Sequence, residues 1–193
     1  MKSIFMTALA ALLVLSPLAN ARAEGGGGKA AGTKYDAVKG FYLQGGFAVI
    51  KTNFGGSEPS LGVDVAAGYR FLPWLGTDVD VYFGARDLGN GVKPRQFGVT
   101  FNGKLYPIGL MSPKTLSSLQ PYVVVGVGGG NYRVKNGSGT GTFIFRAGAG
   151  LDWMITNHFG LYTDVSLNVT PGFKSGGDGG ATGVYALGGK FVF

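Results

Sequence analysis

The chain has 193 residues, of which 37 are glycine, one is histidine and none is cysteine. This composition excludes a disulfide-stapled fold, a cysteine-ligated metal centre and a metal site built from several histidines. Only 14% of the residues are charged, whereas soluble domains carry about 25%. Beyond the N-terminal segment, no stretch reaches the roughly 20 apolar residues of a transmembrane helix, so the apolar composition requires another explanation.

The first 23 residues have the organisation of a secretory signal peptide. Lys2 supplies the positive charge, residues 4–15 form the apolar run, and Ala21 and Ala23 create an A-x-A cleavage site. The apolar run is too short to cross a membrane. We therefore expect export and cleavage after Ala23, with cleavage after Ala21 as the alternative.

Residues 24–39 are rich in glycine and polar residues and are predicted to form a flexible N-terminal segment. Their GGGGK run lacks the upstream glycine of a phosphate-binding loop, and Ala30 stands where Ser or Thr would bind magnesium. We therefore expect no nucleotide site and no other cofactor or metal site in this chain.

Residues 40–193 alternate between apolar and small or polar residues with a period of two. The alternation divides into eight segments, at residues 41–50, 61–71, 75–83, 97–106, 122–132, 143–153, 161–169 and 182–193. Their length fits tilted strands that cross a bilayer in about 9–11 residues. Tight connections alternate with longer ones, except for the long linker at 107–120. The pattern predicts an all-β fold, an eight-stranded antiparallel up-and-down transmembrane β-barrel.

The face opposite the apolar residues distinguishes a membrane barrel from a soluble one. A soluble barrel would present a polar face rich in Lys and Glu to water, but here that face holds small residues and charges of both signs. Inside a narrow barrel such charges must be paired, so we expect an interior polar network that acts as a permanent plug or as a gate. Its members are Asp64, Arg70, Asp78, Asp80, Lys104, Arg146, Asp152, Asp164 and Lys190.

The spacing of these charges suggests specific pairings. If the first tight turn centres on Trp74, Arg70 lies opposite Asp78 across the hairpin, with Lys104 diagonally close. A second expected pair joins Arg146 to Asp164.

Aromatic residues at the strand ends form a second pattern. On the apolar face they would share one level, as in the aromatic girdle of a membrane barrel, although core aromatics of a soluble barrel are the alternative. The predicted girdle consists of Phe41, Phe71, Tyr122, Trp153 and Phe193.

The C-terminus carries the most specific family feature. Tyr185, Leu187, Phe191 and the terminal Phe193 alternate on one face, although Gly189 occupies a position where a larger apolar residue is common. With the runs GYRF at 68–71 and GAGLDW at 148–153, this pattern resembles the eight-stranded outer-membrane β-barrels of Gram-negative bacteria, of the OmpA/OmpX type. The resemblance implies an outer-membrane location, periplasmic termini and recognition of the C-terminal pattern by the barrel-assembly machinery.

The expected function is structural or surface-interacting: envelope integrity, adhesion or host contact. A narrow channel is the alternative, and a lipid-modifying enzyme is third, because the only histidine, His158, falls in a predicted periplasmic turn. Expected partners are outer-membrane lipid and lipopolysaccharide but not nucleic acid, and a monomer is expected. The longer connections carry a net charge of +4, and this positive charge would attract anionic phosphates. The basic residues are Lys51, Arg86, Lys93, Arg95, Arg133, Lys135 and Lys174, and the acidic ones are Glu58, Asp87 and Asp178.

Overall fold

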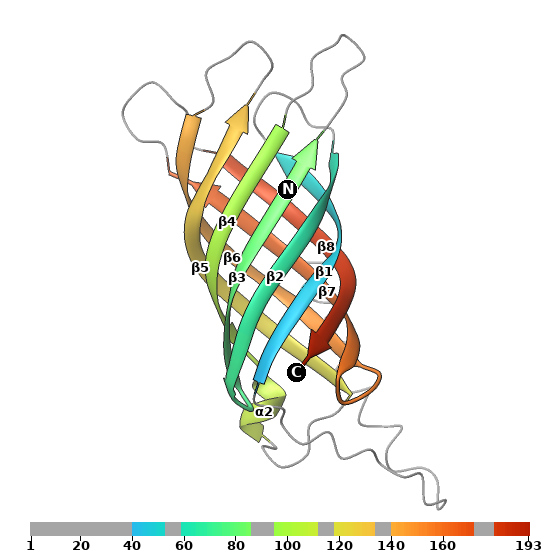
Figure 1. Ribbon diagram of the computed structural model, residues 1–193. Helices are drawn as coiled ribbons and strands as arrows, with labels where there is room; N and C mark the ends of the chain where they lie inside the picture. The colour runs from blue at the N-terminus through green and yellow to red at the C-terminus, as the bar shows by residue number, and fades with distance from the viewer. Residues whose placement is uncertain (1–39, 53–58, 86–94, 112–117, 134–139, 172–179) are drawn as a thin grey trace, which may run out of the picture.

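The protein folds as one closed sheet of eight tilted strands (Figure 1). The computed structural model describes residues 40–52, 59–85, 95–111, 118–133, 140–171 and 180–193, so the predicted signal peptide and the 24–39 segment lie outside the described residues. The strands are β1 (Gly40–Thr52), β2 (Ser60–Leu72), β3 (Leu75–Ala85), β4 (Arg95–Leu105), β5 (Leu119–Arg133), β6 (Thr140–Met154), β7 (Phe159–Thr170) and β8 (Gly180–Val192).

Every strand pairs with its neighbour in sequence, and β8 returns to pair with β1. All eight pairings are antiparallel, and the closing one runs from Tyr42 opposite Val192 to Thr52 opposite Thr182. Closure gives both edges of each strand a hydrogen-bonding partner, which a strand in lipid requires. The prediction of an eight-stranded up-and-down barrel is confirmed.

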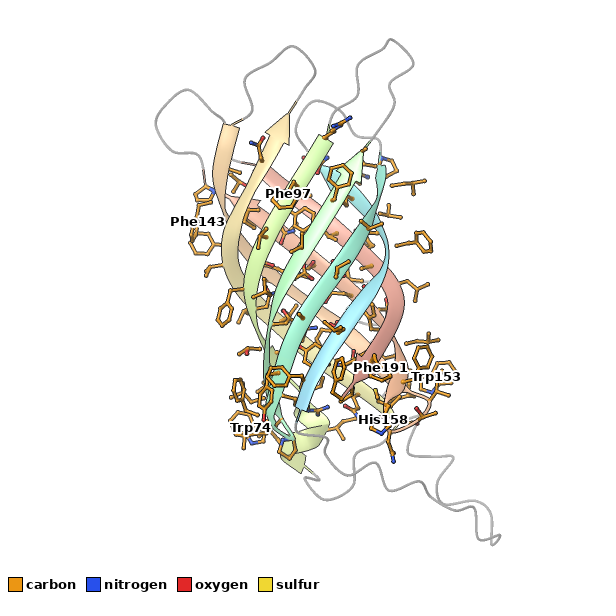
Figure 2. All side chains as sticks on the ribbon, viewed as in Figure 1. Trp74, Phe97, Phe143, Trp153, His158 and Phe191 are labelled. Carbon is orange, nitrogen blue, oxygen red and sulfur yellow. The ribbon has the colours of Figure 1, made fainter. Side chains whose placement is uncertain are left out.

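Side chains alternate between the two faces of the wall because successive residues of a strand point in opposite directions. In β1, Phe47 is 83% exposed on the outside, whereas Ile50 is 0% exposed on the inside. Figure 2 shows the aromatic side chains standing out from the wall. An outer wall of exposed Phe, Leu and Val side chains would be unfavourable in water, but it is the surface that lipid favours.

The connections differ between the two ends of the barrel. At one end, which we call the short-turn end, residues 73–74 join β2 to β3 and residues 155–158 join β6 to β7. The opposite end, which we call the long-connection end, carries the links at residues 53–59, 86–94, 134–139 and 171–179.

The exceptional linker between β4 and β5 contains the short helix α2 (Pro107–Met111), which lies at the short-turn end (Figure 1). The helix packs on the β2–β3 turn so closely that a Cβ atom at Gly109 would lie 2.1 Å from the carbonyl oxygen of Pro73. The backbone N–H of Tyr106 also donates to the carbonyl of Trp74 at 2.9 Å. In the described part of the chain, no helix is long and apolar enough to cross a membrane.

Candidate functional site

The interior is built on tyrosine rings that lie across glycines of the neighbouring strand. Tyr42 of β1 lies over Gly68 of β2, where an added Cβ would be 2.4 Å from the ring Cζ. The ring therefore passes β2, and its hydroxyl donates to Asp78 of β3 at 2.9 Å. Glycine is needed at position 68 because any side chain would occupy the space that the ring uses.

Tyr122 repeats this arrangement on the other side of the barrel. Its ring lies over Gly150, and its hydroxyl donates to Asp164 at 3.0 Å. The prediction that Tyr122 belongs to the outer aromatic girdle is therefore wrong. The face of β5 was ambiguous because valine occupies both sides: Val124 is buried inside, whereas Val123 is exposed outside.

The half of the interior nearer the short-turn end is centred on Asp78 and Lys104. The Lys104 ammonium lies 2.8 Å from the Asp78 carboxylate, which also accepts from the Asn102 amide at 2.7 Å. Lys104 donates further to the Gln44 side-chain oxygen at 2.8 Å. These contacts join β1, β3 and β4 across the lumen.

A second ion pair extends the network to β6 and β8. Lys190 pairs with Asp152, which is fully buried and also accepts from the Tyr106 hydroxyl at 3.2 Å. The Gln44 amide donates to the other Asp152 oxygen at 3.4 Å. Gln44 therefore connects the two ion pairs into one network.

Arg70 has different partners from those predicted. The β2–β3 pairing places Arg70 opposite Gly76, whereas Asp78 lies opposite Gly68. A shift of the hairpin centre by one residue moves each cross-strand partner by two, and the register is irregular between Arg70 and Leu72.

Arg70 instead binds groups at the short-turn end. Its guanidinium donates to Gln120 and to the Pro73 carbonyl, and it lies 4.0 Å from the centre of the Tyr106 ring. Arg70 therefore ties the β2–β3 turn to β5 and to the start of the α2 linker.

The middle of the barrel holds an arginine among three carboxylates. Arg146 lies 2.7 Å from Asp80 and 2.9 Å from Asp164, so the structure brings the predicted Arg146–Asp164 pair together. Asp64 accepts from the Tyr162 hydroxyl at 2.8 Å. One positive charge therefore faces three buried acidic side chains, and Arg146 is their central cation.

Nearer the long-connection end, the interior holds a cluster of buried apolar side chains together with neutral polar ones. Ile50 and Val184 are at most 1% exposed, and an added Cβ at Gly84 would lie 2.6 Å from Ile50 Cδ1. This apolar layer touches the polar network through Tyr162 and shares the long-connection end with the buried neutral side chains of Ser60, Gln96 and Asn168. Its members are Ala48, Ile50, Tyr82, Ile144, Tyr162, Val184 and Ala186.

Aromatic side chains stand on the outer wall near both ends. Figure 2 places Trp153 and Phe191 towards the short-turn end and Phe97 and Phe143 towards the opposite end. The remaining predicted girdle residues, Phe41, Phe71, Trp153 and Phe193, are all exposed on the outer wall. The C-terminal residues also face outward, and their exposed side chains are Tyr185, Leu187, Phe191 and Phe193.

His158 lies at the short-turn end and is hydrogen-bonded to the last residue of β8. Its ring Nδ1 lies 2.9 Å from the carbonyl oxygen of Val192, and its own carbonyl accepts from the Val192 N–H at 2.7 Å. The ring stacks on Phe191. Among the described residues, no group of three or more His, Cys, Asp or Glu side chains could hold a metal ion.

A closed barrel with an apolar outer wall, aromatic bands and a charged, tightly packed interior is a transmembrane β-barrel. The match to known families is more specific: the model of the outer membrane protein beta-barrel domain covers residues 7–191. The chain belongs to this family, which places it in the outer membrane of Gram-negative bacteria.

Solved structures show the same fold at low sequence identity. Neisserial surface protein A is 18% identical, with a TM-score of 0.65, over 79% of this chain and 97% of that chain. OprG from Pseudomonas aeruginosa is 16% identical, with a TM-score of 0.57, over 81% and 96%. Ail, the attachment invasion locus protein of Yersinia pestis, is 17% identical, with a TM-score of 0.56, over 81% and 100%. No curated protein sequence matches the chain.

Proposed function

We propose that this protein is a sealed outer-membrane barrel that anchors its longer connections at the cell surface, where it supports envelope integrity or surface contact. The observation that carries the proposal is the filled interior. Every charged residue of the predicted network is at most 7% exposed, and the apolar layer around Ile50 adds further buried side chains towards the long-connection end. An eight-stranded barrel is just wide enough for its side chains to fill.

The sealed interior predicts that the refolded mature chain produces no steady conductance in planar lipid bilayers, because ions would have to cross a lumen filled by buried side chains, including the apolar layer. The variant with both Ile50→Ser and Ile144→Ser should produce conductance events under the same conditions, since it makes that layer polar. This variant shows that the measurement can detect an opened barrel. A steady ohmic current through the wild-type protein would contradict the sealed-barrel proposal and favour a narrow channel.

The proposal includes an orientation, with the short-turn end and the termini in the periplasm. Short periplasmic turns and longer outer connections are the rule for bacterial outer-membrane barrels, and β1 begins at the short-turn end, where β8 finishes (Figure 1). In this orientation the basic longer connections meet lipopolysaccharide. The binding test that follows addresses this partner.

Neutralising Lys93, Arg95, Lys135 and Lys174 to Gln should weaken binding of the detergent-solubilised barrel to purified lipopolysaccharide by at least about tenfold. Each basic residue near an anionic surface contributes about 1 kcal/mol. Binding can be measured by surface plasmon resonance at fixed salt.

Neutralising the acidic residues of the same connections provides a matched control. The triple variant Glu58→Gln, Asp87→Asn and Asp178→Asn should bind at least as tightly as the wild type. Equal binding by the wild type and the variant lacking the four basic residues would exclude this electrostatic contact.

A further inference from the structure

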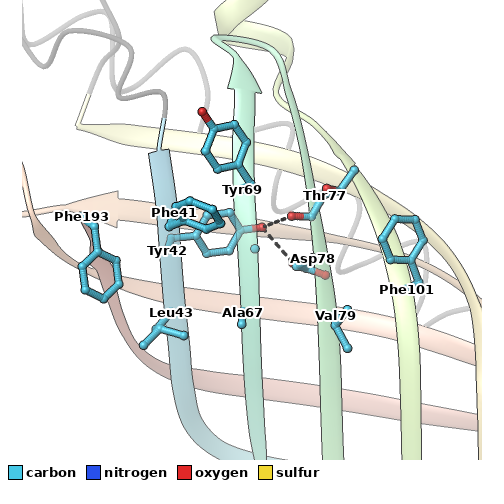
Figure 3. A pocket seen from close by; sticks show the side chains of 11 residues that line it. Phe41, Tyr42, Leu43, Ala67, Tyr69, Thr77, Asp78, Val79, Phe101 and Phe193 are labelled. Carbon is cyan, nitrogen blue, oxygen red and sulfur yellow. Dashed lines mark hydrogen bonds between the residues drawn. The ribbon is translucent and has the colours of Figure 1, made fainter.

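The outer wall has a hollow of about 700 Å³ over β1 to β4, near the short-turn end (Figure 3). Four residues lie in one row across these strands, since Leu43 is opposite Ala67, Ala67 opposite Val79, and Val79 opposite Phe101. The methyl group of Ala67 is much smaller than its neighbours in the row. The hollow therefore has a low floor at β2 between higher walls at β1 and β4.

Aromatic rings border the hollow towards the short-turn end. Phe41 and Tyr69 make an edge contact with ring centres 4.8 Å apart, and Thr77 lies beside Tyr69 in the next strand. Phe193 adds a ring on the β8 side, where its N–H donates to the carbonyl of Phe41. Phe41, Tyr69 and Phe193 in this border are aromatic residues of the kind that membrane barrels place at the lipid–water boundary.

The hollow offers no charge to a ligand. Asp78 contributes to its lining, but that carboxylate is turned inward to Lys104, and the Tyr42 hydroxyl is bound to Asp78 and to the Thr77 carbonyl (Figure 3). Among the residues whose side-chain exposure the structure describes, the charged ones on the outer wall are Lys51 and Arg95, both beside the long-connection end. An occupant therefore has to be apolar where it touches the wall.

We propose that this hollow binds one acyl chain of a phospholipid from the periplasmic leaflet. The membrane is the solvent of this face, as the exposed Phe41, Leu43 and Phe101 side chains show. The four strands span three spacings of about 4.8 Å each, about 14 Å in all, which is wide enough for an acyl chain to lie between the side chains of β1 and β4. The assignment to the periplasmic leaflet rests on the orientation proposed above.

The test uses native mass spectrometry of the refolded mature chain titrated with palmitoyl-oleoyl phosphatidylethanolamine. Wild type should retain one phospholipid, whereas Ala67→Phe fills the floor and should lower the lipid-bound fraction about tenfold. Ala147→Phe is the matched control, because Ala147 is also exposed on the outer wall but lies on β6, away from the hollow. The shift of gel mobility on boiling verifies that all three proteins are folded.

Retention of the phospholipid by Ala147→Phe, with its loss from Ala67→Phe, supports the site. Equal retention by all three proteins, or equal loss from both variants, overturns it. The wild type could instead form a lipid-free dimer that the Ala67→Phe variant does not form. That result would identify a second copy of the chain as the occupant and would also overturn the proposal. If lipopolysaccharide displaces the phospholipid in competition, the assignment to the periplasmic leaflet is wrong. Failure of the sealed-barrel proposal would be detected by a different measurement, as a steady current through the wild-type protein in planar bilayers.

Discussion

Replacing Arg146 with methionine should lower the free energy of unfolding by about 4 kcal/mol, because removing one partner of a buried ion pair leaves uncompensated charge. The guanidinium lies within 2.9 Å of both Asp80 and Asp164, and Thr100 is its neutral partner at 3.3 Å. No other cation pairs with these two carboxylates among the described contacts. The variant would therefore bury two carboxylates that have lost their cation.

The measurement is urea-induced unfolding of the refolded protein in lipid vesicles, followed by the fluorescence of Trp74 and Trp153. Arg95→Met is the matched control, since Arg95 is exposed at the start of β4, and it should change stability by less than about 0.5 kcal/mol. Adding Asp80→Asn to Arg146→Met should restore part of the loss. Equal stability of Arg146→Met and wild type would show that the carboxylates do not depend on this cation.

Replacing Gly188 with valine should lower the free energy of unfolding by more than about 3 kcal/mol, at the upper end of the cost of overpacking. A Cβ at this position would lie 2.2 Å from the carbonyl oxygen of Gly45 and 2.5 Å from the Cα of Gly46. Both atoms belong to the backbone of β1, so no rotation of a side chain can relieve the clash. The two strands that close the barrel would have to separate.

The neighbouring residue provides the control for this prediction. Gly189 points outward, and a Cβ there would first meet Phe159 Cε2 at 3.6 Å, an ordinary contact distance. Gly189→Val should therefore fold with the mobility shift of wild type, whereas Gly188→Val should lose most of the faster-migrating unboiled form. Equal folded fractions of the two variants would show that the β1–β8 approach is adjustable.

The alternation of residues was sufficient to predict the barrel, its strand faces and the inward placement of the nine charges, because one buried face imposes a strict period of two. It failed at Tyr122, where valine on both faces of β5 removed the contrast between them. It also assigned Arg70 the wrong partner, because the exact centre of the β2–β3 hairpin depends on a local irregularity of the register. The tyrosine–glycine contacts could not be predicted, since they require the registers between strands to be known.

The helix α2 illustrates another limit of sequence patterns. Its five residues are too few to show a helical period, and its position depends on contact of Gly109 with the backbone of the β2–β3 turn. The hollow over Ala67 also arises from four strands together. Side-chain size along one strand does not reveal a depression that depends on Leu43 and Phe101 in other strands.

The closing pair β1–β8 joins the two strands that are farthest apart along the chain, with Leu43 opposite Phe191. Every other pairing joins consecutive strands and can begin as a local hairpin, whereas this one needs all eight strands to be present. Until β8 arrives, β1 has an open edge that lipid cannot satisfy. Closure of the sheet and entry into the bilayer are therefore coupled, because the β1 edge has to stay out of the hydrocarbon until β8 pairs with it.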